Sequence, residues 1–359
     1  MPLNSKGEFM NILLDVMGGD NAPDEFIKGA VETINELDKD TKIIMLGNEE
    51  IIKEKLKELY GKENISDISD KISIKNATEV ITNHESPTEA LKTKKDSSMV
   101  VGFKMLKEND GDVFISAGST GALMAGGLLK VGRIKGIDRP ALCTLLPTLD
   151  GIGFMLLDLG ANTNCKPINL VQFAQMGSIY MEKTNNIENP AVGLLNIGAE
   201  DEKGNELTKE VNKKLREQKD INFYGNIEGR DMFNGDVRVV VTDGFTGNVA
   251  LKTIEGIAKA IGKMLKEELT STLPRKIGAG ILSATGAIGS FKKRIDYSEY
   301  GGALLLGIEK PIVKCHGSGK AKDVKIVLKQ AETFVNTKVV DAIKEMLLDN
   351  KENEEVVEK

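Results

Sequence analysis

The sequence is poor in residue types on which several classes of protein depend. Its 359 residues include no tryptophan, 5 tyrosines and 2 histidines, and 48 Lys and Arg against 54 Asp and Glu give a net charge of −6. A chain without a basic excess or abundant aromatic side chains lacks the usual means of holding nucleic acid. With 40% hydrophobic and 28% charged residues, the composition fits neither a disordered nor a fibrous protein. The sequence therefore predicts a globular protein that is not a general DNA- or RNA-binding protein.

Cysteines and long apolar runs are also scarce. Cys143, Cys165 and Cys315 are too few for a disulfide framework and lack the paired spacing of a zinc site. No group of His, Cys and carboxylates has the spacing of a dedicated metal site. The longest uncharged run, Ile277–Phe291, is shorter than the ~20 residues that cross a bilayer. We expect a cytoplasmic protein with no metal, no cofactor and no membrane-spanning segment.

Several catalytic signatures are missing as well. The Gly-rich turns contain neither G-x-G-x-x-G nor G-x-x-x-x-G-K-[ST], the signatures of nicotinamide and nucleoside-triphosphate sites. There is no G-x-S-x-G elbow and no H-E-x-x-H, and a Ser-His-Asp hydrolase could use only His84 or His316. Cys165 beside Lys166 could be a nucleophile with a lowered pKa. A single cysteine of this kind is more often inert, and we prefer that interpretation.

What is present is an alternation of strand and helix patterns. Apolar runs of strand length recur along the chain, and helical spacing follows the first ones, as after Pro23. A long helical region is expected around 89–107. This order predicts a mostly parallel sheet with helices on both faces. The runs 141–146 and 154–159 flank a short turn and predict a hairpin, so the sheet should be mixed. The expected strands are 11–16, 42–46, 72–74, 113–116, 141–146, 154–159, 192–196, 222–227, 238–242 and 312–314.

Small and polar residues gather where these strands end, and in such a sheet ligands bind at the carboxyl ends of the strands. Glycine lets the backbone approach a ligand, and amides at a helix start favour an anion. One such turn alone is more often a tight corner, but six in one chain favour a function. The six stretches are 18–21, 117–121, 158–166, 196–198, 243–248 and 314–319.

These same stretches resemble the bacterial phosphate acyltransferases, the acyl-acyl-carrier-protein:phosphate transacylases of phospholipid synthesis. The resemblance spans 10–347 and departs from the family at Ser119, where Asn is more usual, and at Lys320, where we expect a smaller or acidic residue. The matching blocks are 10–23, SAGSTGALMA (116–125), LDLGANTNCKP (157–167), 193–207, GNIEGRD (225–231), TDGFTGNVALKT (242–253), YSEYGGA (297–303) and 316–318.

The resemblance implies that inorganic phosphate attacks the thioester of a long-chain acyl-carrier protein, giving an acyl phosphate and free carrier protein, the first step of phosphatidic acid synthesis. It also implies a homodimer with an α/β three-layer sandwich similar to the isocitrate and isopropylmalate dehydrogenases and to phosphotransacetylase. We expect one α/β domain over 10–347 with a helical protrusion at about 265–296. Residues 1–9 would be an extension, and 349–359 an acidic, disordered tail.

The expected site needs only to hold phosphate beside a thioester carbonyl and stabilise the oxyanion, because phosphate is itself the nucleophile. We nominate the turn Gly118, Ser119, Thr120 and Gly121 for phosphate, with cations to offset its charge. For Lys166 and Lys252, the alternative interpretation is that each is a solvated surface lysine. The companion candidates are Asn162, Lys166 and Lys252 for phosphate, and Asp158, Asn196, Asn248 and His316 for orienting the cations, holding the oxyanion or protonating the thiolate.

Three other functions stay open. A phosphotransacetylase acting on acyl-CoA would share the reaction and differ in its acyl pocket. A dehydrogenase would need a nicotinamide site, whose signature is absent. A scaffold without catalysis that docks lipid-synthesis proteins is the alternative of a different class.

An apolar stripe that precedes a basic cluster suggests contact with the inner face of the plasma membrane. Ile277, Ile281, Ile288 and Phe291 recur at helical spacing on one helix that Pro274 could start, and Lys292 and Lys293 follow at once. Such a helix can lie in a bilayer interface with its cations beside anionic headgroups. Packing on the protein itself or on a dimer partner is the alternative.

Overall fold

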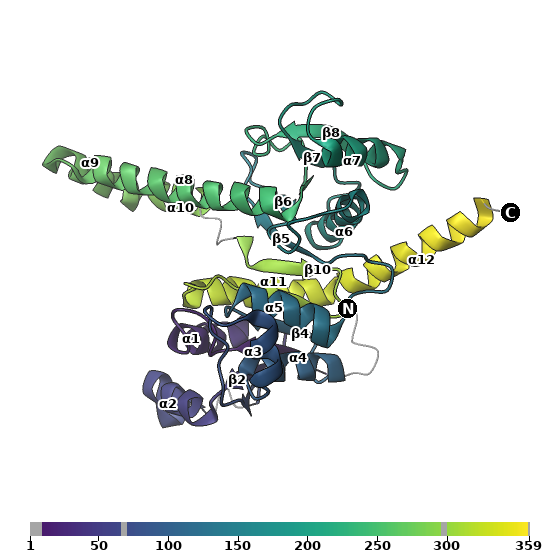
Figure 1. Cartoon of the computed structure of the whole chain (residues 1–359). Helices are drawn as coiled ribbons and strands as arrows, with labels where there is room; N and C mark the ends of the chain where they lie inside the picture. Colours follow the sequence, from purple (N-terminus) through teal and green to yellow (C-terminus); the bar gives the residue numbers. More distant parts are fainter. Residues whose placement is uncertain (1–8, 66–69, 296–299, 358–359) are drawn as a thin grey trace. The chain divides into compact units, whose positions relative to one another are not determined.

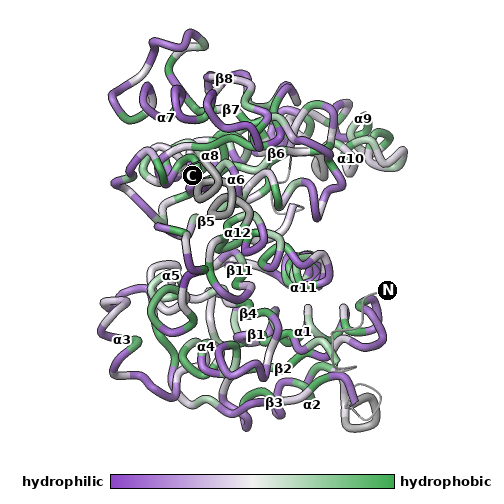
Figure 2. Tube along the Cα trace, turned by 90° about the vertical axis from the view of Figure 1, so that its right-hand side faces the viewer, coloured by the Kyte–Doolittle hydropathy of each residue, from purple (hydrophilic) through white to green (hydrophobic). Residues whose placement is uncertain are grey.

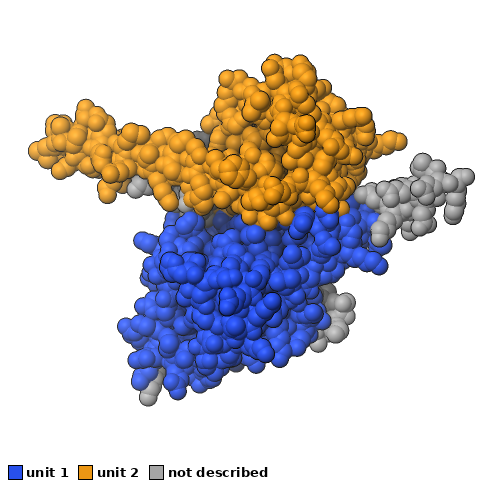
Figure 3. All heavy atoms as spheres, viewed as in Figure 1, with its two compact units in different colours: residues 1–142, 179–188, 301–359 blue, residues 143–178, 189–300 orange. Residues whose placement is uncertain are grey.

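The computed structural model describes residues 9–65, 70–295 and 300–357, and it leaves the side chains of 62–65, 292–295 and 349–357 undescribed. The chain forms two compact units (Figure 3). Unit 1 comprises 1–142, 179–188 and 301–359, and unit 2 comprises 143–178 and 189–300. Whether the two units behave as the one domain predicted for 10–347 stays a prediction.

The described residues form eleven strands that are mostly parallel, which confirms the predicted mixed α/β fold (Figure 1). In unit 1 the strand order is β3-β2-β1-β4-β11-β10, and only β10 runs antiparallel to its neighbour. The bounds are β1 Met10–Asp15, β2 Thr41–Gly47, β3 Ile72–Asn76, β4 Val113–Ser116, β10 Ala303–Leu306 and β11 Ile312–Lys314.

Helices cover both faces of the unit 1 strands. Successive side chains of a strand point to opposite faces, so Leu13 joins the buried cluster of Phe103 and Phe114, while Ile12 and Leu14 face the other way. The two phenylalanine rings meet edge to face at 5.1 Å. The helices are α1 Asp24–Thr33, α2 Glu49–Ile65, α3 Pro87–Thr93, α4 Ser98–Glu108, α5 Thr120–Gly126, α11 Ala321–Asn336 and α12 Val339–Val357, with 3-10 and π-helical turns at Ile34–Glu36 and Gly127–Val131.

Unit 2 contains the predicted hairpin. β5 (Ala141–Leu146, in unit 2 from Cys143) pairs antiparallel with β6 (Phe154–Leu157), and the order continues through β9 (Val239–Val241) and β7 (Val192–Asn196) to β8 (Phe223–Glu228) in parallel. The trace around α7 is largely hydrophilic (Figure 2), and the hydrophobic residues that α7 buries are Val211 and Leu215. The helices are α6 Pro167–Asn185 (in unit 1 from Ile179), α7 Glu206–Glu217, α8 Gly244–Thr270, α9 Leu273–Ala284 and α10 Ala287–Ile295.

The structure differs from the sequence-based expectations at four places. The helical region expected around 89–107 is two helices, because Ser97 caps α4 by accepting a hydrogen bond from Val100 N. β10 was not expected, since its sequence Ala-Leu-Leu-Leu consists of strong helix formers. The helix expected over 273–291 is broken between α9 and α10, where Gly286 has φ +78°. The stretch 349–359, expected to be disordered, is helical as far as Val357.

The helical protrusion predicted at about 265–296 corresponds to the end of α8 together with α9 and α10. α9 packs along α8, and α10 packs on α9 (Figure 1). In the described part of the chain, no helix combines the length and the apolar character that a membrane span requires.

Candidate active site

The predicted phosphate turn of unit 1 lies between β4 and α5, among loops from neighbouring strands. Asp20 N donates to Gly317 O at 2.7 Å, and the amide of Asn21 donates to Ser318 O at 3.0 Å. Cys315 N donates to Ser116 O at 3.0 Å. The loops after β1, β4 and β11 therefore meet at one edge of unit 1, as expected for the carboxyl ends of parallel strands.

Within this turn, the residues differ in what they offer a ligand. Ser119 is buried and caps α5, because its Oγ accepts a hydrogen bond from Ala122 N at 3.4 Å. Thr120 is exposed, Gly121 is half-buried and Gly118 is buried. Ser119 thus acts first on its own helix, and the family departure at this position falls on a capping residue.

His316 lies in the same group of loops. Ser318 N donates to its Nδ1 at 3.3 Å, and Ser318 Oγ lies 2.9 Å from the same atom. A ring nitrogen that accepts from an N–H keeps its lone pair, so we assign the proton of the neutral ring to Nε2. The side chain is exposed. His316 therefore presents an N–H donor, which suits an oxyanion or a phosphate oxygen better than it suits proton abstraction.

Lys314 was not nominated from the sequence, although it ends the strand before His316. Its ammonium group donates to Ala117 O at 3.0 Å and to Cys315 O at 2.6 Å. The side chain is half-buried, and it places a positive charge directly behind the turn that starts at Gly118. Its position at the last residue of a strand was the signal that could have identified it.

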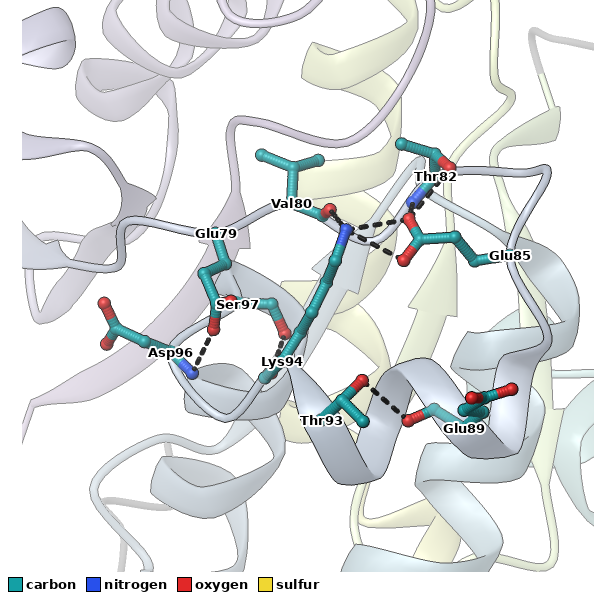
Figure 4. Close-up of polar contacts among 9 residues, drawn as sticks. All are labelled: Glu79, Val80, Thr82, Glu85, Glu89, Thr93, Lys94, Asp96 and Ser97. Carbon is teal, nitrogen blue, oxygen red and sulfur yellow. Dashed lines mark hydrogen bonds and ion pairs between the residues drawn. The ribbon is translucent and has the colours of Figure 1, made fainter.

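The segment that precedes α4 also supports the turn 118–121. Lys94 Nζ donates to Val80 O at 2.7 Å and forms an ion pair with Glu85 at 2.8 Å, and Thr82 N donates to Glu85 at 2.7 Å (Figure 4). The hydrogen bond from Lys94 lowers the pKa of Glu85 to about 2. We call residues 77–97 the strap.

The strap contacts the turn through Pro87 at the start of α3. A Cβ placed on Gly121 would lie 2.9 Å from Pro87 Cγ, so α3 and the first turn of α5 are in direct contact. The sequence shows the strap only as a polar stretch between two apolar patterns, and its role depends on contacts between residues far apart in the chain.

In unit 2, Asp158 organises the loop that follows β6. The carboxylate is 0% exposed, and it accepts hydrogen bonds from Ala161 N at 3.1 Å, Asn162 N at 2.6 Å and Asn162 Nδ2 at 2.9 Å. Asp158 and Asn162, both predicted site residues, are therefore brought together, with Asp158 holding the amide of Asn162.

The start of α8 packs directly on this loop. Gly244 N donates to Asn162 O at 2.8 Å, and a Cβ on Gly247 would overlap the main-chain oxygen of Asp158. Glycine is therefore required at 247 for close approach. Asn248, one residue on, is exposed and lies against Gly160, whose Cβ would be 3.6 Å from Asn248 Cγ.

The two nominated lysines differ in their surroundings. Lys166 is exposed at the start of α6, and among the described residues its ammonium group has no hydrogen bond or ion pair. Lys252 forms an ion pair with Glu255, whose carboxylate oxygens lie 2.9 and 3.0 Å from its Nζ. Among the described residues, no carboxylate competes for the positive charge of Lys166, whereas a phosphate at Lys252 would compete with Glu255.

Asn196 is engaged in its own loop. Its Nδ2 donates to Lys203 O at 3.1 Å, and its Oδ1 accepts from Ile197 N at 2.9 Å. These bonds hold the loop after β7, and a direct role of Asn196 with a substrate stays a prediction.

Two pockets lie among the described residues of unit 2 that surround α8. A polar one of about 480 Å³ lies between the starts of α7 and α8 and includes Cys165. The other, of about 470 Å³, is apolar; we call it the α8 groove. The α8 groove is lined by Pro147, Thr148, Leu149, Phe233, Ile254, Ile257, Ala258, Ile261 and Phe291.

The predicted membrane residues fall on two helices rather than one. Ile277 and Ile281 are 59% and 62% exposed on α9, but on α10 Ile288 is half-buried and Phe291 lines the α8 groove. The prediction of one continuous stripe is wrong, because the break at Gly286 ends the helical register. The side chains of Lys292 and Lys293 lie outside the described residues.

No described thiol is prepared for nucleophilic attack. Burial raises the pKa of Cys315 to about 11, and Cys143 is also buried. Cys165 is half-buried, and its Sγ donates to Asn162 O at 3.4 Å. In the described part of the chain, no three His, Cys, Asp or Glu side chains gather as metal ligands would.

Two solved structures that share this fold are a phosphotransacetylase and a phosphotransacylase. A phosphotransacetylase from Streptococcus pyogenes aligns with a TM-score of 0.57 and 15% identity, over 92% of this chain and 94% of that one. A branched-chain phosphotransacylase from Enterococcus faecalis aligns with a TM-score of 0.55 and 14% identity, over 91% and 99%. At these identities the likeness establishes the fold alone.

Sequence comparison establishes the family. The model of a family described as fatty acid synthesis protein matches residues 10–342. The phosphate acyltransferase of Thermoanaerobacter pseudethanolicus is 51% identical over 336 residues, which cover 94% of this chain and 97% of that protein. That of Bacillus subtilis is 46% identical over 345 residues, covering 96% and 100%. The chain belongs to the phosphate acyltransferase family, a family of transferases in phospholipid synthesis.

Proposed function

We propose that this chain transfers a long acyl group from acyl-acyl-carrier protein to inorganic phosphate. The observation that carries the proposal is the match to phosphate acyltransferases at 46–51% identity over nearly the whole chain. A phosphate oxygen attacks the thioester carbonyl carbon, the carbon–sulfur bond breaks, and the carrier leaves as a thiolate that takes up a proton. The products are an acyl phosphate and free carrier protein.

Each unit supplies groups suited to this chemistry. In unit 1, backbone amides of the turn 118–121, the ammonium group of Lys314 and Nε2–H of His316 suit an anion. In unit 2, Lys166 is a cation that no carboxylate of the described residues pairs with, and Asp158 fixes the amide of Asn162. Donors and cations held in advance are what phosphate attack requires, because the developing oxyanion must be stabilised without reorganisation.

The α8 groove favours a long acyl chain over an acetyl group. All but one of its lining residues are apolar, and each buried methylene contributes about 0.8 kcal/mol. Ala258→Trp should fill the groove and lower turnover of palmitoyl-carrier protein more than that of a short-chain thioester. Ala260→Trp, on an exposed position of the same helix outside the groove, is the matched control. Equal effects of both variants would show that the α8 groove does not hold the acyl chain.

The reaction itself is tested with pure protein, labelled phosphate and palmitoyl-carrier protein, with palmitoyl-CoA and acetyl-CoA as alternative donors. Formation of labelled acyl phosphate from the carrier-bound chain is expected. Product from acetyl-CoA alone would favour the phosphotransacetylase activity, and no product from any donor would favour a scaffold.

We also propose that the protein is a homodimer that contacts anionic membranes. Val249 and Met264 of α8 are exposed hydrophobic residues outside the α8 groove, and a second copy would remove them from water. Light scattering should show a dimer at micromolar concentration, and a monomer would contradict this proposal.

The membrane proposal depends on α9, where the exposed Ile277 and Ile281 lie one turn apart. Ile277→Glu with Ile281→Glu should abolish binding to anionic vesicles while activity on a soluble donor persists. Unchanged vesicle binding, or conversion of a dimer to a monomer, would show that α9 does not serve the membrane.

A further inference from the structure

Asp15 is a buried carboxylate at the end of β1 that the reaction does not use directly. It is 1% exposed, and charged side chains are seldom fully buried unless they are paired. Its Oδ1 accepts hydrogen bonds from Met17 N at 3.0 Å and Gly18 N at 3.1 Å. Its Oδ2 accepts from Ser116 Oγ at 2.7 Å. Asp15 therefore joins its own loop to the end of β4.

The hydrogen bonds continue into the predicted phosphate turn. Ser116 Oγ accepts from Gly118 N at 3.1 Å. A hydroxyl has one proton and two acceptor lone pairs. Because the hydroxyl of Ser116 donates its hydrogen bond to Asp15, a lone pair of Ser116 Oγ accepts from Gly118 N–H. The carboxylate thus fixes the orientation of Ser116, and Ser116 fixes the first amide of the turn.

The backbone around this chain of bonds is closely packed. A Cβ on Gly18 would lie 2.7 Å from Asp15 Oδ2 and 2.7 Å from Gly118 N. The loop after β1 therefore touches the loop after β4 at the point where Asp15 and Ser116 meet. The two loops are therefore in direct contact beside the hydrogen bond between Asp15 and Ser116.

Asp15 contributes little to stability through its charge. Burial raises its pKa, and the hydrogen bonds from Ser116 and Ser98 lower it without offsetting the burial. The folded protein therefore disfavours the ionised form relative to the unfolded chain. Replacement by neutral, isosteric Asn removes this unfavourable contribution, so we expect the variant to fold.

We propose that Asp15 is a positioning residue that acts through Ser116 to hold the turn 118–121 in its phosphate-binding geometry. This inference rests on the proposed function, which assigns phosphate to that turn. In Asp15→Asn the amide nitrogen cannot accept the proton of Ser116, and in Ser116→Ala the acceptor of Gly118 N–H is lost. Both variants should loosen the turn.

The test is steady-state kinetics of Asp15→Asn and Ser116→Ala in the full chain, with phosphate and palmitoyl-carrier protein each varied. We expect kcat/KM for phosphate to fall about tenfold, the scale of one lost hydrogen bond. KM for the acyl donor should stay unchanged. Thr33→Val is the control, because Thr33 is 0% exposed in the same unit and its Oγ1 donates to Gly29 O, away from the turn.

Loss of activity that affects both substrates equally and follows the melting temperature would overturn the inference, as would the same loss in Thr33→Val. If the wild-type protein forms no acyl phosphate, the proposed function fails. Calorimetric titration with inorganic phosphate then decides the positioning role separately. A weaker affinity in Ser116→Ala supports it, and an unchanged affinity refutes it.

Discussion

Gly247→Ala tests whether the close contact between α8 and the loop after β6 holds the candidate site of unit 2. The added Cβ would overlap the main-chain oxygen of Asp158 and come within 2.9 Å of Thr242 Cγ2. Because the obstacle is backbone rather than a flexible side chain, either α8 or the loop of Asp158 and Asn162 must move.

The expected magnitude follows from two opposing contributions. Overpacking costs about 1–3 kcal/mol, and replacing a helical glycine by alanine returns about 0.5–1 kcal/mol. The net loss in the free energy of unfolding is about 1–2 kcal/mol, and the melting temperature should fall by about 2–8 °C for a unit of this size. Gly256→Ala on the same helix is the matched control, since its Cβ would meet nothing within 4 Å; it should raise the melting temperature slightly.

The assay is thermal unfolding followed by circular dichroism, together with turnover of palmitoyl-carrier protein. Gly247→Ala should lower both the melting temperature and the turnover, and Gly256→Ala should lower neither. If Gly247→Ala is as stable and as active as the wild-type protein, the contact does not hold the site and this reasoning is refuted.

Three further predictions concern the strap, the cysteines and metal ions. The pKa of Glu85 is lowered to about 2, so the stability that its carboxylate contributes is present above pH ~4.5 and is lost as the pH falls toward 2. Lys94→Gln should therefore lower the melting temperature at pH 6, and the difference from wild type should shrink on acidification; a difference independent of pH would contradict the ion pair. Cys165→Ala should keep substantial turnover because phosphate is the nucleophile, and mass spectrometry that finds an acyl group on any cysteine would show a covalent route instead. Addition of EDTA should leave turnover unchanged, and activity lost to the chelator and restored by Mg²⁺ would require a metal site.

The sequence was sufficient to predict the fold class and the edges where polar groups gather. Alternating apolar runs identified ten of the eleven described strands, and the short turn at 147–151 identified the β5–β6 hairpin. What the sequence could not show were interruptions that depend on single contacts. Lys94, the C-cap of α3, binds Val80 O, 14 residues earlier in the chain, and Ser97 caps α4 through the amide of Val100.

The sequence predicted the location of the candidate site better than it predicted the roles of the individual residues. Asp158 and Asn162 meet as their spacing suggests, but Asp15 resembled one more residue of a buried strand and was not nominated. An ionisable residue that ends a buried strand was the available signal. The partner of Lys252 could have been found from the spacing of three residues to Glu255, which places both on one helix face.

α9 has no buried residue, unlike a helix such as α7, which buries Val211 and Leu215. A helix of 12 residues is marginal in water by itself, so its order comes from its contacts with α8 and α10 rather than from a core. Amide protons of α9 should therefore exchange with solvent sooner than those of the central strands, through local opening that leaves the rest of unit 2 folded. Such a segment can change its surroundings, from water to a lipid interface or to another chain, without exposing any of the hydrophobic interior.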